Sequence, residues 1–310
     1  MLLSRVADAL YWMSRYLERA EHTARLISVR LDLGLDRRPN SDEWDFADLY
    51  AALKTPYPAD APQHPAALVD RWMFDALNRD SILACLIGAR ENARQVREEI
   101  SADMWEQVNA LFLRLKGMDR SAGRHHVPRL VIEGVHLFEG ITDATMAHGE
   151  GWQYLQVGRF LERAAATAAL LDLYFRDVLL PSNHVEWVGL LRSCSALEAY
   201  CRCYTADLRP ERIAEFLLLN PEFPRSVRFA ADRVDSALRA IAQFTGRRFA
   251  GRAERLAGRL HASLDYSQVD EILEEDPHAY LEGIRRSCSQ IHTAAYQTYI
   301  MYPIETALPA

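Results

Sequence analysis

Two copies of one short pattern carry the residues of this chain that are best suited to charge chemistry. Each copy reads Arg-x-Leu-Glu-Arg-Ala, and the second follows the first at a constant offset without a gap. The charged residues of the two copies are Arg15, Glu18, Arg19, Arg159, Glu162 and Arg163. Arginine binds carboxylates and phosphates through two parallel hydrogen bonds, and paired glutamates can transfer protons. The pattern therefore permits structural ion pairs, an anion site, or acid–base catalysis.

Both copies are predicted to be helical, because their apolar residues recur at three- and four-residue spacing and so form one helix face. The arginines lie on the opposite face, and the two glutamates lie on the flank between the faces. Arg19 points about 100° away from its neighbour Glu18. We therefore expect each glutamate to pair with an arginine elsewhere. In a structural charge network the pairs would be Glu18 with Arg163 and Glu162 with Arg19.

Three interpretations of the motif remain open at this stage. In the first, the pairs form a closed structural charge network. In the second, the four arginines line a pocket for a carboxylate or phosphate, and the glutamates orient them. In the third, Glu18 and Glu162 are an acid–base pair, which requires both carboxylates to face one water-accessible cavity. Solvent access to the motif distinguishes the third interpretation from the first.

Other polar residues form a second group of candidates. Four of them lie on one predicted helix as a ladder of charges or, if the asparagine is buried, as part of an inter-helix network; they are Arg90, Glu91, Asn92 and Arg94. Trp152 precedes the second copy of the motif. Glu133 and His136 match one Glu-x-x-His element of a di-iron pattern, whereas the second match by letters, Glu275 with His278, spans a helix start with a proline. We therefore expect no metal site.

Composition and missing motifs narrow the classes of function. A net charge of −7 disfavours a nucleic-acid binder. No apolar run approaches the ~18 residues of a membrane span, and no secretory signal opens the chain. Five cysteines, an odd number, indicate free thiols and a cytoplasmic protein. Phosphate-binding loops, dinucleotide glycine patterns and nucleophile elbows are all missing, so no cofactor is expected.

The chain is predicted to be an all-α, tandem-duplicated helical bundle whose halves are related by a pseudo-two-fold axis. No sustained period-two pattern indicates a strand. The predicted repeats span residues 1–147 and 148–310 and are expected to share one core. In each half an asparagine, Asn78 or Asn220, is expected to open a turn into a long helix, over residues 80–100 and 222–243.

Further stretches combine with the motif into a recognisable pattern. They are residues 89–94, Ser101 with Trp105 and Glu106, residues 142–146, residues 150–152 and residues 224–227. With the paired Arg-x-Leu-Glu-Arg-Ala helices they resemble the bacterial alpha-E family, an all-helical domain of unknown function named for its Glu-Arg motif. The resemblance covers nearly the whole chain. The two copies also differ in that Ala166 stands where the first copy has His22, so any role of His22 is not duplicated.

The resemblance implies a setting rather than a reaction. Members of the family are expected beside a circularly permuted ATP-grasp protein and a transglutaminase-like peptidase, in a system that makes, modifies or trims a peptide or amide. It implies no catalytic residues. The leading hypothesis is thus an accessory component that binds a protein partner, an anionic peptide end or a small carboxylate. The alternatives are an enzyme that uses the duplicated Glu-Arg pairs and a purely structural interaction protein.

Overall fold

The structure is a computed structural model that describes residues 2–35, 47–53, 55–57, 65–118, 124–175, 184–205, 207–246 and 250–301. Within these ranges all regular structure is helical, which confirms the all-α prediction. The first six helices are α1 (Ser4–Leu35), α2 (Ala47–Ala52), α3 (Pro65–Phe74), α4 (Ile82–Gln95), α5 (Ala102–Lys116) and α6 (His126–Thr145). The others are α7 (Glu150–Phe175), α8 (His184–Ser193), α9 (Leu197–Tyr204), α10 (Pro210–Leu219), α11 (Val227–Phe244), α12 (Arg252–Tyr266), α13 (Val269–Glu274), α14 (Pro277–Ala295) and the π-helix η1 (Tyr296–Ile300).

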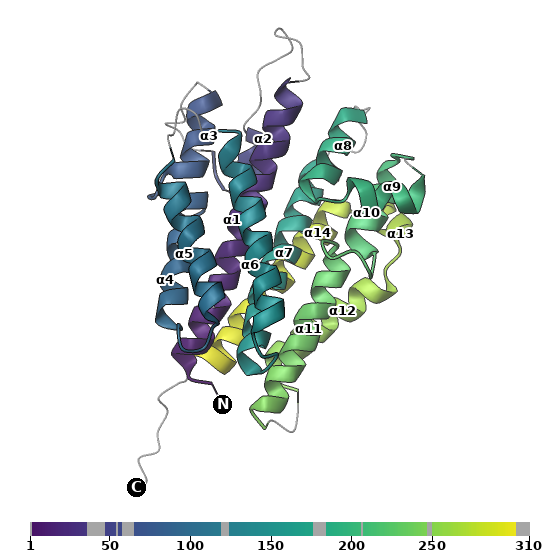
Figure 1. Cartoon of the computed structure of the whole chain (residues 1–310). Coiled ribbons are helices and arrows are strands. Elements are labelled where there is room, and N and C mark those ends of the chain that lie inside the picture. The colour runs from purple at the N-terminus through teal and green to yellow at the C-terminus, as the bar shows by residue number, and fades with distance from the viewer. Residues whose placement is uncertain are drawn as a thin grey trace.

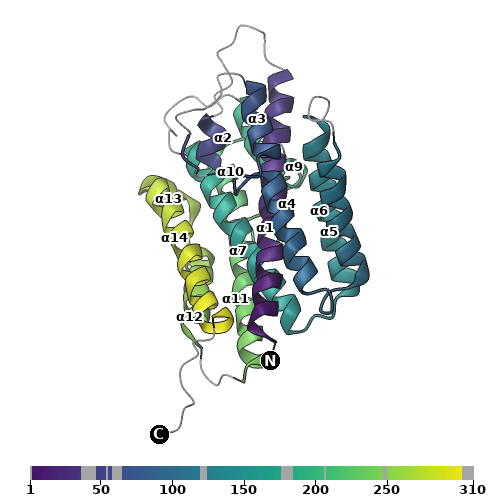
Figure 2. The same ribbon diagram turned by 90° about the vertical axis from the view of Figure 1, so that its left-hand side faces the viewer.

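The two motif helices, α1 and α7, lie side by side at the centre of the bundle (Figures 1 and 2). On one side α1 packs on α4 and α6, and α5 joins these two. On the other side α7 packs on α11 and α14, and α12 joins these two. Both halves therefore use the same order of packing. The pseudo-two-fold axis and the boundary near residue 147 stay predictions.

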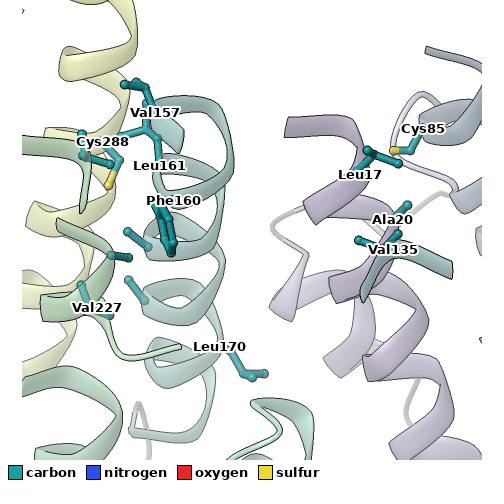
Figure 3. Packing of buried hydrophobic residues seen from close by; sticks show 14 of the residues in the cluster. Leu17, Ala20, Cys85, Val135, Val157, Phe160, Leu161, Leu170, Val227 and Cys288 are labelled. Carbon is teal, nitrogen blue, oxygen red and sulfur yellow. The ribbon is translucent and has the colours of Figure 1, made fainter. Parts of the chain in front are cut away.

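The hydrophobic core is one cluster that contains residues from both halves. Figure 3 shows Leu17 of α1 beside Cys85 of α4, and Leu161 of α7 beside Cys288 of α14. Burial of a leucine side chain such as Leu17 or Leu161 contributes about 1.5–3 kcal/mol. All five cysteines are free thiols, as predicted. Among the described helices, none combines the length and apolar composition that a bilayer crossing needs.

Gly158 is where the two motif helices approach most tightly among the described glycines. A Cβ atom there would lie 2.3 Å from the backbone oxygen of Tyr11 and 2.3 Å from Ser14 Oγ, far inside van der Waals contact. Only a glycine fits such an approach. It brings Glu162, one turn further along α7, within reach of the arginines of α1.

The helices that follow the two asparagine turns begin later than the sequence suggested. Helix α4 begins at Ile82 and α11 at Val227. Ser81 and Ser226 are the N-caps, and their hydroxyls accept hydrogen bonds from the backbone three residues on, at 3.1 and 3.0 Å. Helix α4 also ends at Gln95 rather than at residue 100. The turn before each cap places one charged residue, Asp80 or Arg225, next to a motif helix.

Candidate functional site

Glu18 and Arg163 form the most buried ion pair of the motif. Arg163 donates from Nε to Glu18 Oε1 and from Nη2 to Oε2, both at 2.6 Å. The two side chains are only 2% and 3% exposed. This bidentate geometry joins α7 to α1. The pair that the repeat predicts is therefore present.

Glu162 mirrors this arrangement from the other helix. Its Oε1 accepts a hydrogen bond from Arg19 Nε at 2.6 Å, and its Oε2 accepts one from Arg15 Nε at 2.7 Å. Arg19 Nη1 also donates to Asp80 Oδ1 at 2.7 Å, in the turn before α4. The second predicted pair, Glu162 with Arg19, is thus present and is extended by Arg15 and Asp80.

Around Glu18 the charges form what we call the closed cluster. Its members are Glu18, Glu21, Arg25, Glu139, Arg159, Arg163 and Arg225. Arg225 donates to Glu21 Oε1 at 2.8 Å, and Arg159 donates to Glu139 Oε2 at 2.7 Å. These side chains occupy the space between α1, α6, α7 and the turn before α11.

The pKa values in the closed cluster follow from burial and pairing. Burial by itself would raise the pKa of Glu18, but Arg163 and Arg225 outweigh it and lower the pKa. Burial, together with the neighbouring Arg25, lowers the pKa of Arg225 to about 10. Glu18 and Arg225 therefore remain charged at neutral pH. Burial raises the pKa of Glu139, the carboxyl that pairs with Arg159.

A cavity of about 250 Å³ lies on the other side of the motif, next to Glu162. The cavity is lined by Arg15, Arg19, His22, Thr23, Ala52, Leu53, Asp80, Glu162, Ala165, Ala166, Ala169 and Arg285. Residues of α1, α2, α7 and α14 thus meet around it, together with the turn before α4. Its lining combines apolar and charged side chains, as the lining of a small-ligand site does.

The lining of the cavity carries three arginines against two carboxylates. Arg285 also donates to Glu282, at 2.5 Å, outside the lining. Burial and the neighbouring Arg25 lower the pKa of His22 to about 4, so this imidazole is neutral. Within the part of the chain that the structure describes, His22 Nε2 and Thr23 Oγ1 are buried without a hydrogen-bond partner. The cavity therefore offers cationic and polar groups for a ligand.

Acid will destabilise the fold through Glu162. Burial would raise its pKa, but Arg15 and Arg19 lower it to about 2, below the value of 4.5 for a free side chain. Because the folded-state pKa is depressed, the stabilisation is complete above pH about 4.5 and is lost as the pH falls towards about 2. Urea unfolding across this window should show a loss for the wild type that Glu162→Gln lacks. Equal losses in both proteins would contradict the prediction.

The two motif glutamates do not share one cavity. Glu162 lines the cavity, whereas Glu18 lies in the closed cluster and is not part of the lining. Each carboxylate is held ionised by arginines at 2.6–2.7 Å. Acid–base catalysis by this pair needs both carboxylates at one substrate and pKa values near the working pH, and neither condition is met.

The second group of candidates lies away from the cavity. Arg90 and Arg94 pair with Glu91 at 3.2 and 3.0 Å on the surface of α4, and Arg90 also donates to Asn109 of α5. Asn92 donates to the carbonyl of Gly88 in its own helix at 2.8 Å. Such exposed pairs stabilise by a few tenths of a kcal/mol. These residues form a surface ladder and do not join the motif network.

His136 borders the closed cluster, whereas Trp152 lies in the first turn of α7. His136 is half exposed, and its Nε2 lies 3.4 Å from Glu21 Oε1, at the rim of the closed cluster. Trp152 stacks on His148 with ring centroids 3.8 Å apart. Among the described residues, no group of metal-ligating side chains could hold an ion.

Several site residues were not predicted from the sequence. They are Glu21, Arg25, Asp80, Glu139, Arg225 and Arg285. Glu18, Glu21 and Arg25 lie at three- and four-residue spacing, a signal of one shared helix face that could have identified the network. Asp80 and Arg285 carry no such signal, because only the packing of α4 and α14 brings them to the motif.

Comparison with known proteins now gives these observations a family. Residues 2–300 match Alpha-E, described as "A predicted alpha-helical domain with a conserved ER motif". This match covers nearly all of the chain, so the chain belongs to the Alpha-E family. The Glu-Arg motif of that description corresponds in letters to Glu18-Arg19 and Glu162-Arg163.

The chain is also similar to uncharacterised mycobacterial proteins. It is 24% identical over 319 residues to "Uncharacterized protein Mb2597" of Mycobacterium bovis, and 23% identical to "Uncharacterized protein Rv2567" of Mycobacterium tuberculosis. Each alignment covers 93% of this chain but only 34% of the relative. The chain therefore spans about a third of the length of the curated relatives it matches. No solved structure matches it.

Proposed function

We propose that this Alpha-E protein is an accessory, ligand-binding component of a system that forms or modifies peptides or amides. In this proposal it works beside an ATP-grasp protein and a transglutaminase-like peptidase. The observation that carries the binding role is the cavity, in which three arginines face only two carboxylates. An anionic peptide end or a small carboxylate would bind to the arginines through its carboxylate group.

The state of the motif supports binding rather than catalysis. Glu18 and Glu162 are already engaged by arginines from the opposite helix. Buried ion pairs of this kind fix the relative position of two helices, although they add little net stability. The motif then holds the two helices in place, and Arg285, whose partner Glu282 lies outside the cavity lining, is the arginine that a ligand would contact.

In the mycobacterial relatives the matching part is about a third of a longer chain. Covalent linkage in those proteins holds the matching part at high effective concentration beside the rest of the chain. This arrangement in the relatives supports an accessory role for the Alpha-E part.

The test is a reconstitution with purified proteins. Sedimentation of the chain with the ATP-grasp protein of the same organism should reveal a complex, and the complex should ligate its substrate faster than the ATP-grasp protein alone. Arg285→Gln, in the cavity lining, should reduce this gain in rate. The control Arg129→Gln changes an exposed ion pair on α6 and should not reduce it. Absence of a complex together with absence of a gain would refute the proposal, as would peptide turnover by the chain alone.

A further inference from the structure

The register of the two motif copies relates the cavity beside Glu162 to the closed cluster beside Glu18. When the two copies are aligned so that Arg15 matches Arg159, three polar residues of α1 align with three alanines of α7. Glu21, His22 and Arg25 correspond in this way to Ala165, Ala166 and Ala169. All three alanines line the cavity. The cavity is therefore the space that longer side chains fill in the first copy.

An ion pair fills the corresponding space of the closed cluster. Arg25 donates to Glu21 one turn away, and the two side chains are 6% and 1% exposed. Arg25 also donates to the carbonyl of Ser193 at 2.5 Å, and Glu21 accepts from Arg225 at 2.8 Å. A buried, hydrogen-bonded pair of a carboxylate and a cation thus occupies the space that corresponds to the cavity.

The cavity also has one partner for a carboxylate and one partner for a cation, as the closed cluster does. Arg285 reaches it from α14, and among the described residues its ion-pair partner is Glu282, which is 38% exposed and screened by solvent. At the other edge, hydrogen bonds from described residues to the Asp80 carboxylate involve Oδ1 alone, so Oδ2 can accept another donor. The alanines and Leu53 form an apolar wall between these ends.

We propose that the cavity binds a zwitterionic amino compound, an amino acid or a short peptide. Its carboxylate lies against Arg285 and its ammonium group against Asp80, and its short apolar body contacts the alanines. The ligand takes the place that the Glu21–Arg25 pair takes in the first copy. This inference rests on the proposed function in that it uses the same cavity, and it adds the requirement for a positive group on the ligand.

The charge requirement is tested by calorimetric titration with three matched probes. L-alanyl-L-alanine carries both charges, its N-acetyl derivative lacks the ammonium group, and its C-terminal amide lacks the carboxylate. The dipeptide should bind at least about tenfold more tightly than either derivative, because each lost group is a charge-assisted hydrogen bond. Binding of the dipeptide and the N-acetyl derivative with equal affinity would overturn the zwitterion inference, as would no binding of any probe.

Two variants assign the ends of the ligand. Arg285→Gln should abolish the preference for the dipeptide over the amide and keep its preference over the N-acetyl derivative. Asp80→Asn should do the reverse. Both residues are partly exposed, so both variants should fold. Arg129→Gln, at a surface pair of α6, is the control and should bind as the wild type does. Loss of both preferences in either variant, or of neither, would contradict the assignment.

A second experiment grafts the first copy onto the second. The variant Ala165→Glu with Ala169→Arg restores the pair of Glu21 and Arg25 in the cavity. It should lose dipeptide binding by at least about tenfold while keeping a cooperative melt. Ala165→Gln with Ala169→Gln is the neutral control of similar size and should melt at a lower temperature than the charged graft. Undiminished dipeptide binding to a folded graft would overturn the inference. The reconstitution with the ATP-grasp protein tests the proposed function separately.

Discussion

Glu18→Gln is expected to lower the free energy of unfolding by about 3–5 kcal/mol, which is the usual effect of removing one partner from a buried ion pair. Glutamine keeps the shape of the side chain but removes the charge that Arg163 and Arg225 share. Its amide also presents a donor to guanidinium groups that have only donors. The two arginines are then left as buried charges with Glu21 and Glu139 as their remaining partners.

Urea unfolding at neutral pH measures this loss, and Glu133→Gln is the matched control. Glu133 also pairs with an arginine, Arg129, at 2.7 Å, but the two side chains are 64% and 80% exposed. Exposed pairs of this kind contribute about 0–1 kcal/mol. If both variants lost the same small amount of unfolding free energy, the closed cluster would not stabilise the packing of α1 on α7.

Gly158→Ala is expected to be the most damaging replacement among the described glycines. The added methyl group would meet the backbone oxygen of Tyr11 at 2.3 Å, and a backbone atom cannot turn aside as a flexible side chain does. Helices α1 and α7 must separate, which weakens the pairs of Glu18 and Glu162 one turn away. Overpacking typically costs about 1–3 kcal/mol and occasionally more, and here the loss of ion-pair geometry is added to it.

Gly140→Ala in α6 is the control for helix propensity. A Cβ at Gly140 meets nothing within 4 Å, so this change should raise stability by about 0.5–1 kcal/mol. Thermal melts of both variants show the contrast as a lower and a higher midpoint. A neutral effect of Gly158→Ala would mean that the two motif helices are not held at this close approach.

Repetition in the sequence made the fold and the cross-helix pairs predictable. The constant offset between the copies indicated two equivalent helices, and the position of Glu18 on the flank indicated an arginine on the other copy. The structure contains that pair with Arg163 and the matching pair of Glu162 with Arg19. The helix starts were less predictable. Asparagine and serine are both good N-caps, and the caps are Ser81 and Ser226 rather than the asparagines that precede them.

The cavity could not be predicted from the motif, because it depends on a difference between the copies. Three alanines of α7 replace polar residues of α1, and alanines on a helix are ordinarily read as good helix formers rather than as the wall of a site. Arg285 lies more than a hundred residues from the second copy, and only the packing of α14 on α7 brings it to the cavity. Long-range packing of this kind leaves no local signal.

The central claim is that the motif glutamates are permanent counter-ions and that any ligand binds beside them. A carbon-13 NMR titration of the glutamate side-chain carboxyl groups tests it most directly, with Glu18→Gln and Glu162→Gln to assign the two signals. Arginines lower the pKa of both carboxyls, and that of Glu162 to about 2. Neither signal should therefore shift between pH about 5 and about 8, where a catalytic acid or base must titrate. A midpoint for either carboxyl within that range would contradict the claim and restore the acid–base interpretation.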